Sequence, residues 1–148
     1  MATNTTDTDS RFSWRKLAIT GVLAGIIAAI SNAIYYLIAV PVTGVEVLAP
    51  VPGADGLDTV GLVPVIASSF IFLLIATAVY GAVLRAVPSN AEMIYLVIAV
   101  IAFFISFRLP GNYFDPTFPV DARWVLGGTH VVAAVAGVMS MLTIYRRL

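Results

Sequence analysis

Few side chains in this 148-residue chain can bind a ligand or carry a proton in an apolar environment. The single histidine, His130, lies in the run "GGTHVVAAVAGV", which otherwise consists of apolar residues, glycine and one threonine. Five further polar residues interrupt or border the apolar runs: Asn32, Ser69, Ser106, Arg108 and Thr129. Amides, hydroxyls, a guanidinium and an imidazole can all hydrogen-bond a small molecule, and the imidazole can titrate near neutral pH. These six residues form our candidate ligand-binding site.

The same residues argue against most metal, redox and hydrolytic chemistry. A haem held by two imidazoles needs two histidines, and a zinc site needs three or four suitable ligands. The chain has one histidine and no cysteine, which excludes thiolate sites and disulfides. No G-x-S-x-G motif provides a nucleophilic serine for His130. We therefore expect no catalytic residues, no metal and no cofactor, and an enzyme ranks third among the function classes.

Composition predicts an integral membrane protein. The chain is 60% hydrophobic and 11% charged, with a mean hydropathy of +0.99. An ordinary soluble domain has about 25% charged residues, so this chain lacks the side chains to cover a water-exposed surface. Eight basic residues balance eight acidic ones, and this balance indicates no nucleic-acid partner. The expected environment is the lipid bilayer.

Four apolar runs are long enough to cross a bilayer as helices, which takes about 20 residues with a range of roughly 17 to 25. They cover residues 17–40, 62–84, 91–107 and 124–145, of which the third is the shortest. We expect Pro41 to end the first helix, and Ser89 to Glu92 to form an S-x-x-E capping box at the start of the third. Asp121 is expected to cap the fourth helix. The predicted fold class is all-α, a four-transmembrane-helix bundle.

The basic residues predict the orientation of this bundle. Six of the eight lie on the side that holds both termini: Arg11, Arg15, Lys16, Arg85, Arg146 and Arg147. Under the positive-inside rule both termini are cytoplasmic (N-in/C-in), and the two longer loops lie outside. Residues 1–14 are polar and are expected to form a disordered cytoplasmic tail, whereas residues 15–148 form the transmembrane domain.

Small residues follow one face of the first helix. Gly21, Gly25, Ala28 and Asn32 recur at spacings of 4, 3 and 4 residues. The Gly21–Gly25 pair is a GxxxG motif, which lets another helix approach closely. We expect this face to pack against a helix of the same chain, and the alternative is a homodimer formed through the first helix.

The candidate residues share one depth in the bilayer. Asn32 lies about 12 Å from the outer end of the first helix at the usual helical rise. The candidate polar groups of the other helices also lie in the outer half, whereas the inner half is expected to be almost entirely aliphatic. In one interpretation these groups are hydrogen-bonded links between helices. In the other they line a pocket that opens outward, with His130 as a ligand-binding group and Arg108 at its mouth.

Three short segments carry a resemblance to a known family: "AAISNAIYYLI", "ISFRLP" and "LGGTHVVAA". They place an asparagine in the first helix (Asn32), a serine and a proline at the close of the third (Ser106, Pro110) and a histidine early in the fourth (His130). In this pattern the chain resembles an uncharacterised family of small bacterial four-helix integral membrane proteins, a domain of unknown function. The resemblance covers residues 15–145 and implies a bacterial cytoplasmic-membrane protein, without any activity, substrate or cofactor.

These observations favour a structural or accessory subunit of the cytoplasmic membrane. The alternative is a small-molecule or lipophile-binding membrane protein with a polar pocket in the outer half of the bilayer. Besides lipid, the expected partners are a second copy of the chain or another membrane protein.

Overall fold

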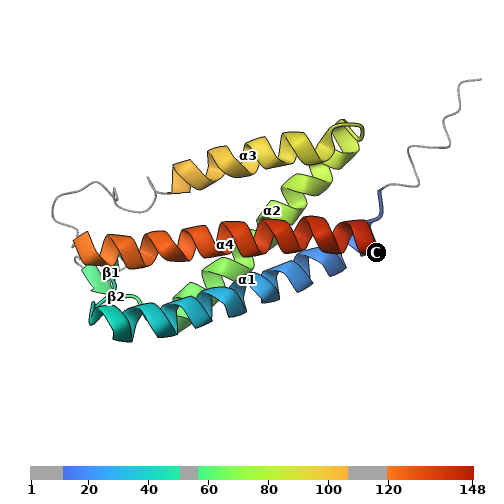
Figure 1. Ribbon diagram of the computed structural model, residues 1–148. Helices are drawn as coiled ribbons and strands as arrows, with labels where there is room; N and C mark the ends of the chain where they lie inside the picture. Colours follow the sequence, from blue (N-terminus) through green and yellow to red (C-terminus); the bar gives the residue numbers. More distant parts are fainter. Residues whose placement is uncertain (1–11, 51–56, 107–119) are drawn as a thin grey trace, which may run out of the picture.

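The computed structural model describes residues 12–50, 57–106 and 120–148, which form four helices and a small hairpin (Figure 1). The helices are α1 (Trp14–Thr43), α2 (Leu62–Ala86), α3 (Ala91–Ser106) and α4 (Val120–Arg147). Strands β1 (Leu48–Pro50) and β2 (Leu57–Thr59) pair in antiparallel fashion between α1 and α2. The expected all-α fold class is confirmed. The first 11 residues of the expected tail lie outside the described residues.

Three of the described helices, α1, α2 and α4, are long and apolar enough to cross a membrane. The third, α3, is the shortest, as expected, and its 16 residues end at Ser106. Phe107, the last residue of the expected third helix, lies outside the described residues. The chain therefore has the helices of a multi-pass membrane protein.

The first helix is longer than expected at both ends. It begins at Trp14, with the Ser13 side chain as its cap, and it continues past Pro41. The expectation that Pro41 ends the helix is therefore wrong. Proline lacks only its own N–H, so the residues that follow can still bond to the preceding turn. The helix ends where Gly44 adopts a φ of 66° and donates its N–H to the Val40 carbonyl, a left-handed conformation that suits glycine.

The starts of α3 and α4 also differ from the expected caps. The first helical bond of α3 runs from the N–H of Ile94 to the carbonyl of Asn90. Asn90 rather than Ser89 therefore occupies the cap position. The expected capping box is wrong, because Glu92 is the second residue after this cap and a capping box needs the glutamate at the third. Helix α4 begins at Val120, which places Asp121 in its first turn instead of at the cap. A carboxylate there still interacts favourably with the positive end of the helix dipole.

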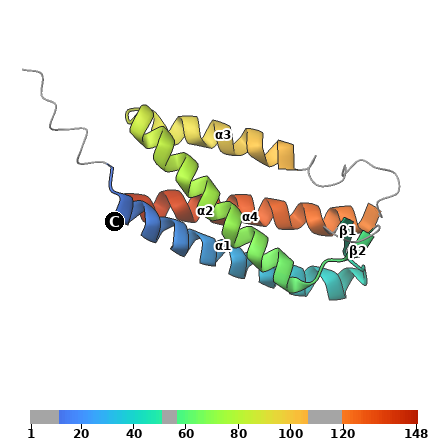
Figure 2. The ribbon, with the colours of Figure 1, turned by 180° about the vertical axis from the view of Figure 1, so that it is seen from behind.

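The central helix of the bundle is α1, which makes most of the interhelical contacts, with α2 and α4. Figures 1 and 2 show α1 and α4 side by side, α2 crossing them obliquely and α3 lying apart from α1. A Cβ atom on Gly21 would lie 3.2 Å from Thr77 of α2, and one on Gly25 would lie 2.8 Å from the Phe70 ring of α2. The small-residue face of α1 thus packs against α2 of the same chain, as expected.

Only two residues of α3 are buried, Ala91 and Tyr95, and both lie near its N-terminal end. The Tyr95 ring meets the Tyr80 ring edge-on at 5.2 Å, and Tyr80 meets Tyr145 at 5.3 Å. This tyrosine cluster (Tyr80, Tyr95 and Tyr145) lies at the end of the bundle where α1 begins and α4 ends. We name this end the inner end, and the opposite half the outer half, after the orientation expected from the sequence. The expectation of an almost purely aliphatic inner half is wrong, because these large rings fill the space between the helices there.

Candidate functional site

The first polar contact in the outer half joins α1 to α2. Asn32 is buried and donates a hydrogen bond from Nδ2 to Ser69 Oγ at 2.6 Å. Ser69 is also buried, and its hydroxyl donates to the Val65 carbonyl at 2.6 Å. Because a hydroxyl has a single proton, Ser69 accepts from Asn32, which determines the direction of the Asn32 amide.

This arrangement leaves the other end of the Asn32 amide without a donor. Its Oδ1 atom is buried and has no hydrogen-bond partner among the residues that the structure describes. A buried acceptor without a hydrogen bond destabilises a protein by about 1–3 kcal/mol. Chemically, it is an uncharged acceptor suited to the O–H or N–H group of a ligand. Arg108, the donor expected at the mouth of the pocket, lies outside the described residues.

The second polar contact joins α3 to α4. The Ser106 hydroxyl donates to the Phe103 carbonyl at 2.6 Å, and its oxygen lies 3.4 Å from Nδ1 of His130. Because the serine proton is directed at the carbonyl, the geometry favours a histidine that donates from Nδ1 to Ser106. The contact is long and therefore weak, and the His130 ring is half-buried.

The remaining candidate, Thr129, is bonded within its own helix, where its hydroxyl donates to the Leu126 carbonyl at 2.6 Å. The residue before it, Gly128, lies directly against the side chain of Tyr35 in α1, so that a Cβ atom would overlap the tyrosine hydroxyl. The glycine leaves room for the Tyr35 side chain where α1 and α4 pack. Tyr35 was not among the expected site residues, and the only signal for its contact is the glycine beside Thr129.

The five described candidates thus form two interhelical pairs and one bond within a helix. The structure brings Asn32 to Ser69 and Ser106 to His130, at two different helix contacts. Hydrogen bonds of this kind, between polar side chains of neighbouring helices, are typical links between membrane helices. The ligand-binding role of the set stays a prediction, and the Asn32 acceptor is its most specific feature.

A family model described as a family of unknown function (DUF6069) matches residues 12–147. The chain belongs to this family. The expected resemblance to an uncharacterised domain of unknown function is therefore confirmed. Neither a curated protein nor a solved structure matches the chain significantly. The matched segment includes all four helices, so every described candidate residue of this DUF6069 protein belongs to it.

At the inner end of the DUF6069 domain lies a charged contact that the sequence analysis missed. Arg146 of α4 donates from Nε to Glu92 Oε1 of α3 at 2.8 Å, and its Nη2 contacts the other carboxylate oxygen. Next to this pair, the Lys16 ammonium lies 4.7 Å from the centre of the Tyr145 ring. From the sequence, Glu92 was expected in a capping box, and the basic residues were expected to set the topology. The only available signal was that opposite charges lie at the same end of two predicted helices.

Proposed function

We propose that this protein is a structural or accessory subunit of the cytoplasmic membrane, and that α3 packs against a helix of a partner membrane protein. The observation that carries this proposal is the poor coverage of α3. Two of its 16 residues are buried, whereas α1 buries eight of 30. From Val97 onward, five of its large apolar side chains are more than half exposed: Val97, Val100, Ile101, Phe104 and Ile105.

The length of α3 also favours a partner. At about 1.5 Å per residue, the 16 described residues of α3 are about 24 Å long, compared with about 30 Å for the hydrocarbon core of a bilayer. Association with another helix is one way in which a short apolar helix relieves such a mismatch. Because the exposed side chains are apolar, the partner helix would pack on them by van der Waals contact.

The other helices use their close-packing faces within the chain. The small-residue face of α1 lies against α2, and Gly137 of α4 lies against Leu73 of α2. The two polar pairs likewise link helices of this chain. Among the described helices, α3 is therefore the one that buries the smallest share of its residues within the chain.

Site-specific photo-crosslinking in native membranes tests this proposal. A photoreactive residue replaces Ile101 on α3, and the control replaces Ile30 on α1, because the two isoleucines are almost equally exposed, at 53% and 55%. We expect a discrete crosslinked product from the Ile101 position alone. A second copy of the chain with a different tag identifies homodimers. Equal products from both positions, or a product that contains only the second copy, would contradict the accessory-subunit proposal.

The second candidate function is the binding of a small molecule or lipophile in the outer half of the bilayer. The unpartnered Oδ1 atom of Asn32 favours it. Native mass spectrometry of the detergent-extracted protein tests it by comparison with Asn32→Leu, which keeps the side-chain size and removes the acceptor. A small molecule retained by the wild type and lost from the variant would support binding. A complex of defined stoichiometry without such a molecule would support the accessory subunit.

A further inference from the structure

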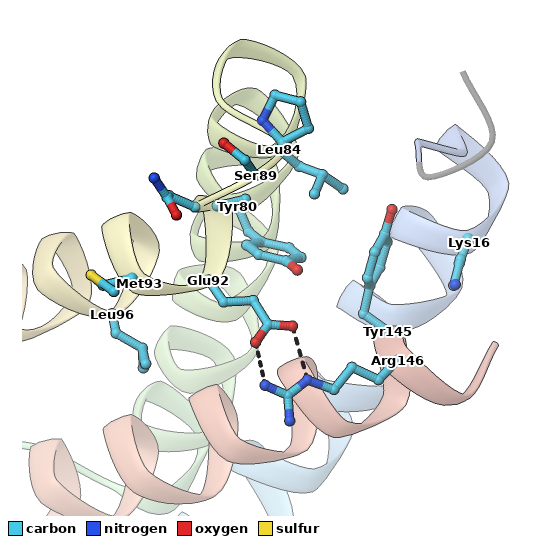
Figure 3. A pocket seen from close by; sticks show the side chains of 12 residues that line it. Lys16, Tyr80, Leu84, Ser89, Glu92, Met93, Leu96, Tyr145 and Arg146 are labelled. Carbon is cyan, nitrogen blue, oxygen red and sulfur yellow. Dashed lines mark hydrogen bonds and ion pairs between the residues drawn. The ribbon is translucent and has the colours of Figure 1, made fainter. Parts of the chain in front are cut away.

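A cavity of about 740 Å³ opens at the inner end of the bundle, between the start of α1, the end of α2, the start of α3 and the end of α4 (Figure 3). Its size lies within the range of about 300–1,000 Å³ that is usual for small-molecule sites. The polar part of its lining consists of Lys16, Tyr80, Ser89, Asn90, Glu92, Tyr145 and Arg146. All four helices contribute to one site that is distinct from the polar pairs of the outer half.

The charges that line the cavity favour an anion. Lys16 and Arg146 provide two cations, whereas Glu92 provides one carboxylate, so the lining carries a net charge of about +1 at neutral pH. Both cations are held in place: Lys16 lies over the Tyr145 ring, and Arg146 is bound through two nitrogen atoms to Glu92. Figure 3 shows Glu92 directed at Arg146, with Tyr145 between Lys16 and Tyr80. Because these groups are already ordered, little side-chain entropy is lost when a ligand binds.

The other part of the lining is apolar. Leu84, Met93 and Leu96 belong to it; Leu84 is buried, and the last two are exposed on α3. The cavity therefore has cations and hydroxyls on one side and an apolar helix surface on the other. It also lies at the ends of the helices, which is where the headgroups of a bilayer lie when the helices cross it.

We propose that this cavity binds the phosphodiester headgroup of an anionic glycerophospholipid, with the acyl chains starting beside Met93 and Leu96, before the part of α3 that is proposed to contact the partner helix. Lysine and arginine are the usual protein ligands of phosphate oxygens. The hydroxyl and amide groups of Ser89 and Asn90 suit the hydroxyls of a glycerol headgroup. Basic residues at the same end of the bundle, Arg85 and Arg147, add to the local positive potential that attracts anionic lipid.

The test measures lipid binding to the purified full chain in detergent, by native mass spectrometry and by thermal unfolding. The probes are dioleoylphosphatidylglycerol, dioleoylphosphatidylcholine with the same acyl chains, and soluble glycerol 3-phosphate. We expect one phosphatidylglycerol molecule to bind per chain, at least about fivefold more tightly than phosphatidylcholine. We also expect phosphatidylglycerol to raise the melting temperature. Equal affinity for the two lipids would overturn the proposal. Binding of glycerol 3-phosphate as tight as that of the lipid would overturn the lipid assignment in favour of a soluble phosphate ester.

Matched charge variants locate the binding site. Lys16→Gln removes a cation from the lining and leaves the Glu92–Arg146 pair intact, whereas Arg15→Gln removes the same charge from an exposed neighbour outside the lining. We expect Lys16→Gln to weaken phosphatidylglycerol binding by about five- to tenfold, because one charged hydrogen bond is lost at a partly exposed site. We expect Arg15→Gln to weaken it by less than about twofold.

A second pair of variants repeats the comparison on α4. Arg146→Gln removes the other cation of the lining, and Arg147→Gln is its control on the adjacent residue. We expect Arg146→Gln alone to weaken binding. If the two control variants reduce affinity as much as the lining variants do, the lipid is attracted by the general charge of this end, and the proposed site is wrong.

Discussion

Replacement of Gly25 by leucine tests the close contact between α1 and α2. A Cβ atom at this position would lie 2.8 Å from the Phe70 ring and 3.4 Å from the Phe70 carbonyl oxygen. Carbon atoms in contact are normally about 3.5–4.0 Å apart, so the first added carbon is already about 0.7 Å too close to the ring. Leucine adds three further carbons. The ring can rotate away but the carbonyl cannot, so the two helices must separate locally.

The expected size of the effect follows from this overlap. Overpacking of a well-packed core destabilises a protein by about 1–3 kcal/mol. For a chain of this size, such a loss lowers the melting temperature by roughly 3–10 °C. Gly25→Ala adds only the first carbon and should cause a smaller decrease in melting temperature, because the Phe70 ring can adjust.

Thermal unfolding in detergent measures this effect, and native mass spectrometry reports the oligomeric state of the same samples. The control is Ala18→Leu, which places the same side chain on the exposed face of α1. Its melting temperature should stay close to that of the wild type. If Gly25→Leu instead leaves the melting temperature unchanged and converts a dimer into a monomer, the small-residue face forms a dimer and the reasoning from the α1–α2 contact is refuted.

Three further predictions concern topology and the two ends of the bundle. A cysteine at Asp58 should react with an impermeant thiol reagent in intact cells and one at Ser89 should not, and labelling of Ser89 would reverse the predicted orientation. His130→Ala should lower the melting temperature because α4 loses its contact with Ser106, whereas His130→Gln should have a smaller effect because it keeps a donor; equal effects would exclude the hydrogen bond as the cause. Glu92→Arg should loosen the contact between α3 and α4, and a second substitution, Arg146→Glu, should restore the wild-type melting temperature; a double variant no more stable than Glu92→Arg would show that the ion pair does not hold α3.

The extents of the helices were largely predictable because length and apolarity determine which segments can cross a bilayer. The details at the helix ends were not, because they depend on local backbone geometry. Pro41 is compatible with a last helical turn as well as with a helix end, and the left-handed conformation of Gly44 decides where α1 ends. Similarly, the S-x-x-E pattern at Ser89 forms no capping box, because the cap is Asn90 and the residue three positions after it is Met93.

The depth of the outer polar residues was predictable from their distance to the helix ends, but their pairing was not. Whether Asn32 meets Ser69 or His130 depends on which helix lies beside α1 and at what crossing angle. The ion pair between Glu92 and Arg146 joins residues 54 positions apart and depends on α3 lying beside the end of α4. By position in the sequence, the three residues of the tyrosine cluster would be assigned to an interfacial belt. Only the packing of the helices shows that they are buried against one another.

The two ends of the bundle differ in their balance of donors and acceptors, and this difference bears on function. In the outer half, a hydrogen bond between membrane helices contributes about 0.6 kcal/mol on average, less than the roughly 1–3 kcal/mol that an unpaired buried acceptor costs. The bond from Asn32 to Ser69 therefore does not offset the unpartnered Oδ1 atom, and stability alone does not explain an asparagine at this position. At the inner end, the charged side chains of the cavity provide mainly donors, because an arginine and a lysine together offer about eight N–H groups and Glu92 two carboxylate oxygens. A donor ligand would complete the outer site and an anion the inner one, so the two proposed binding sites call for ligands of opposite chemistry.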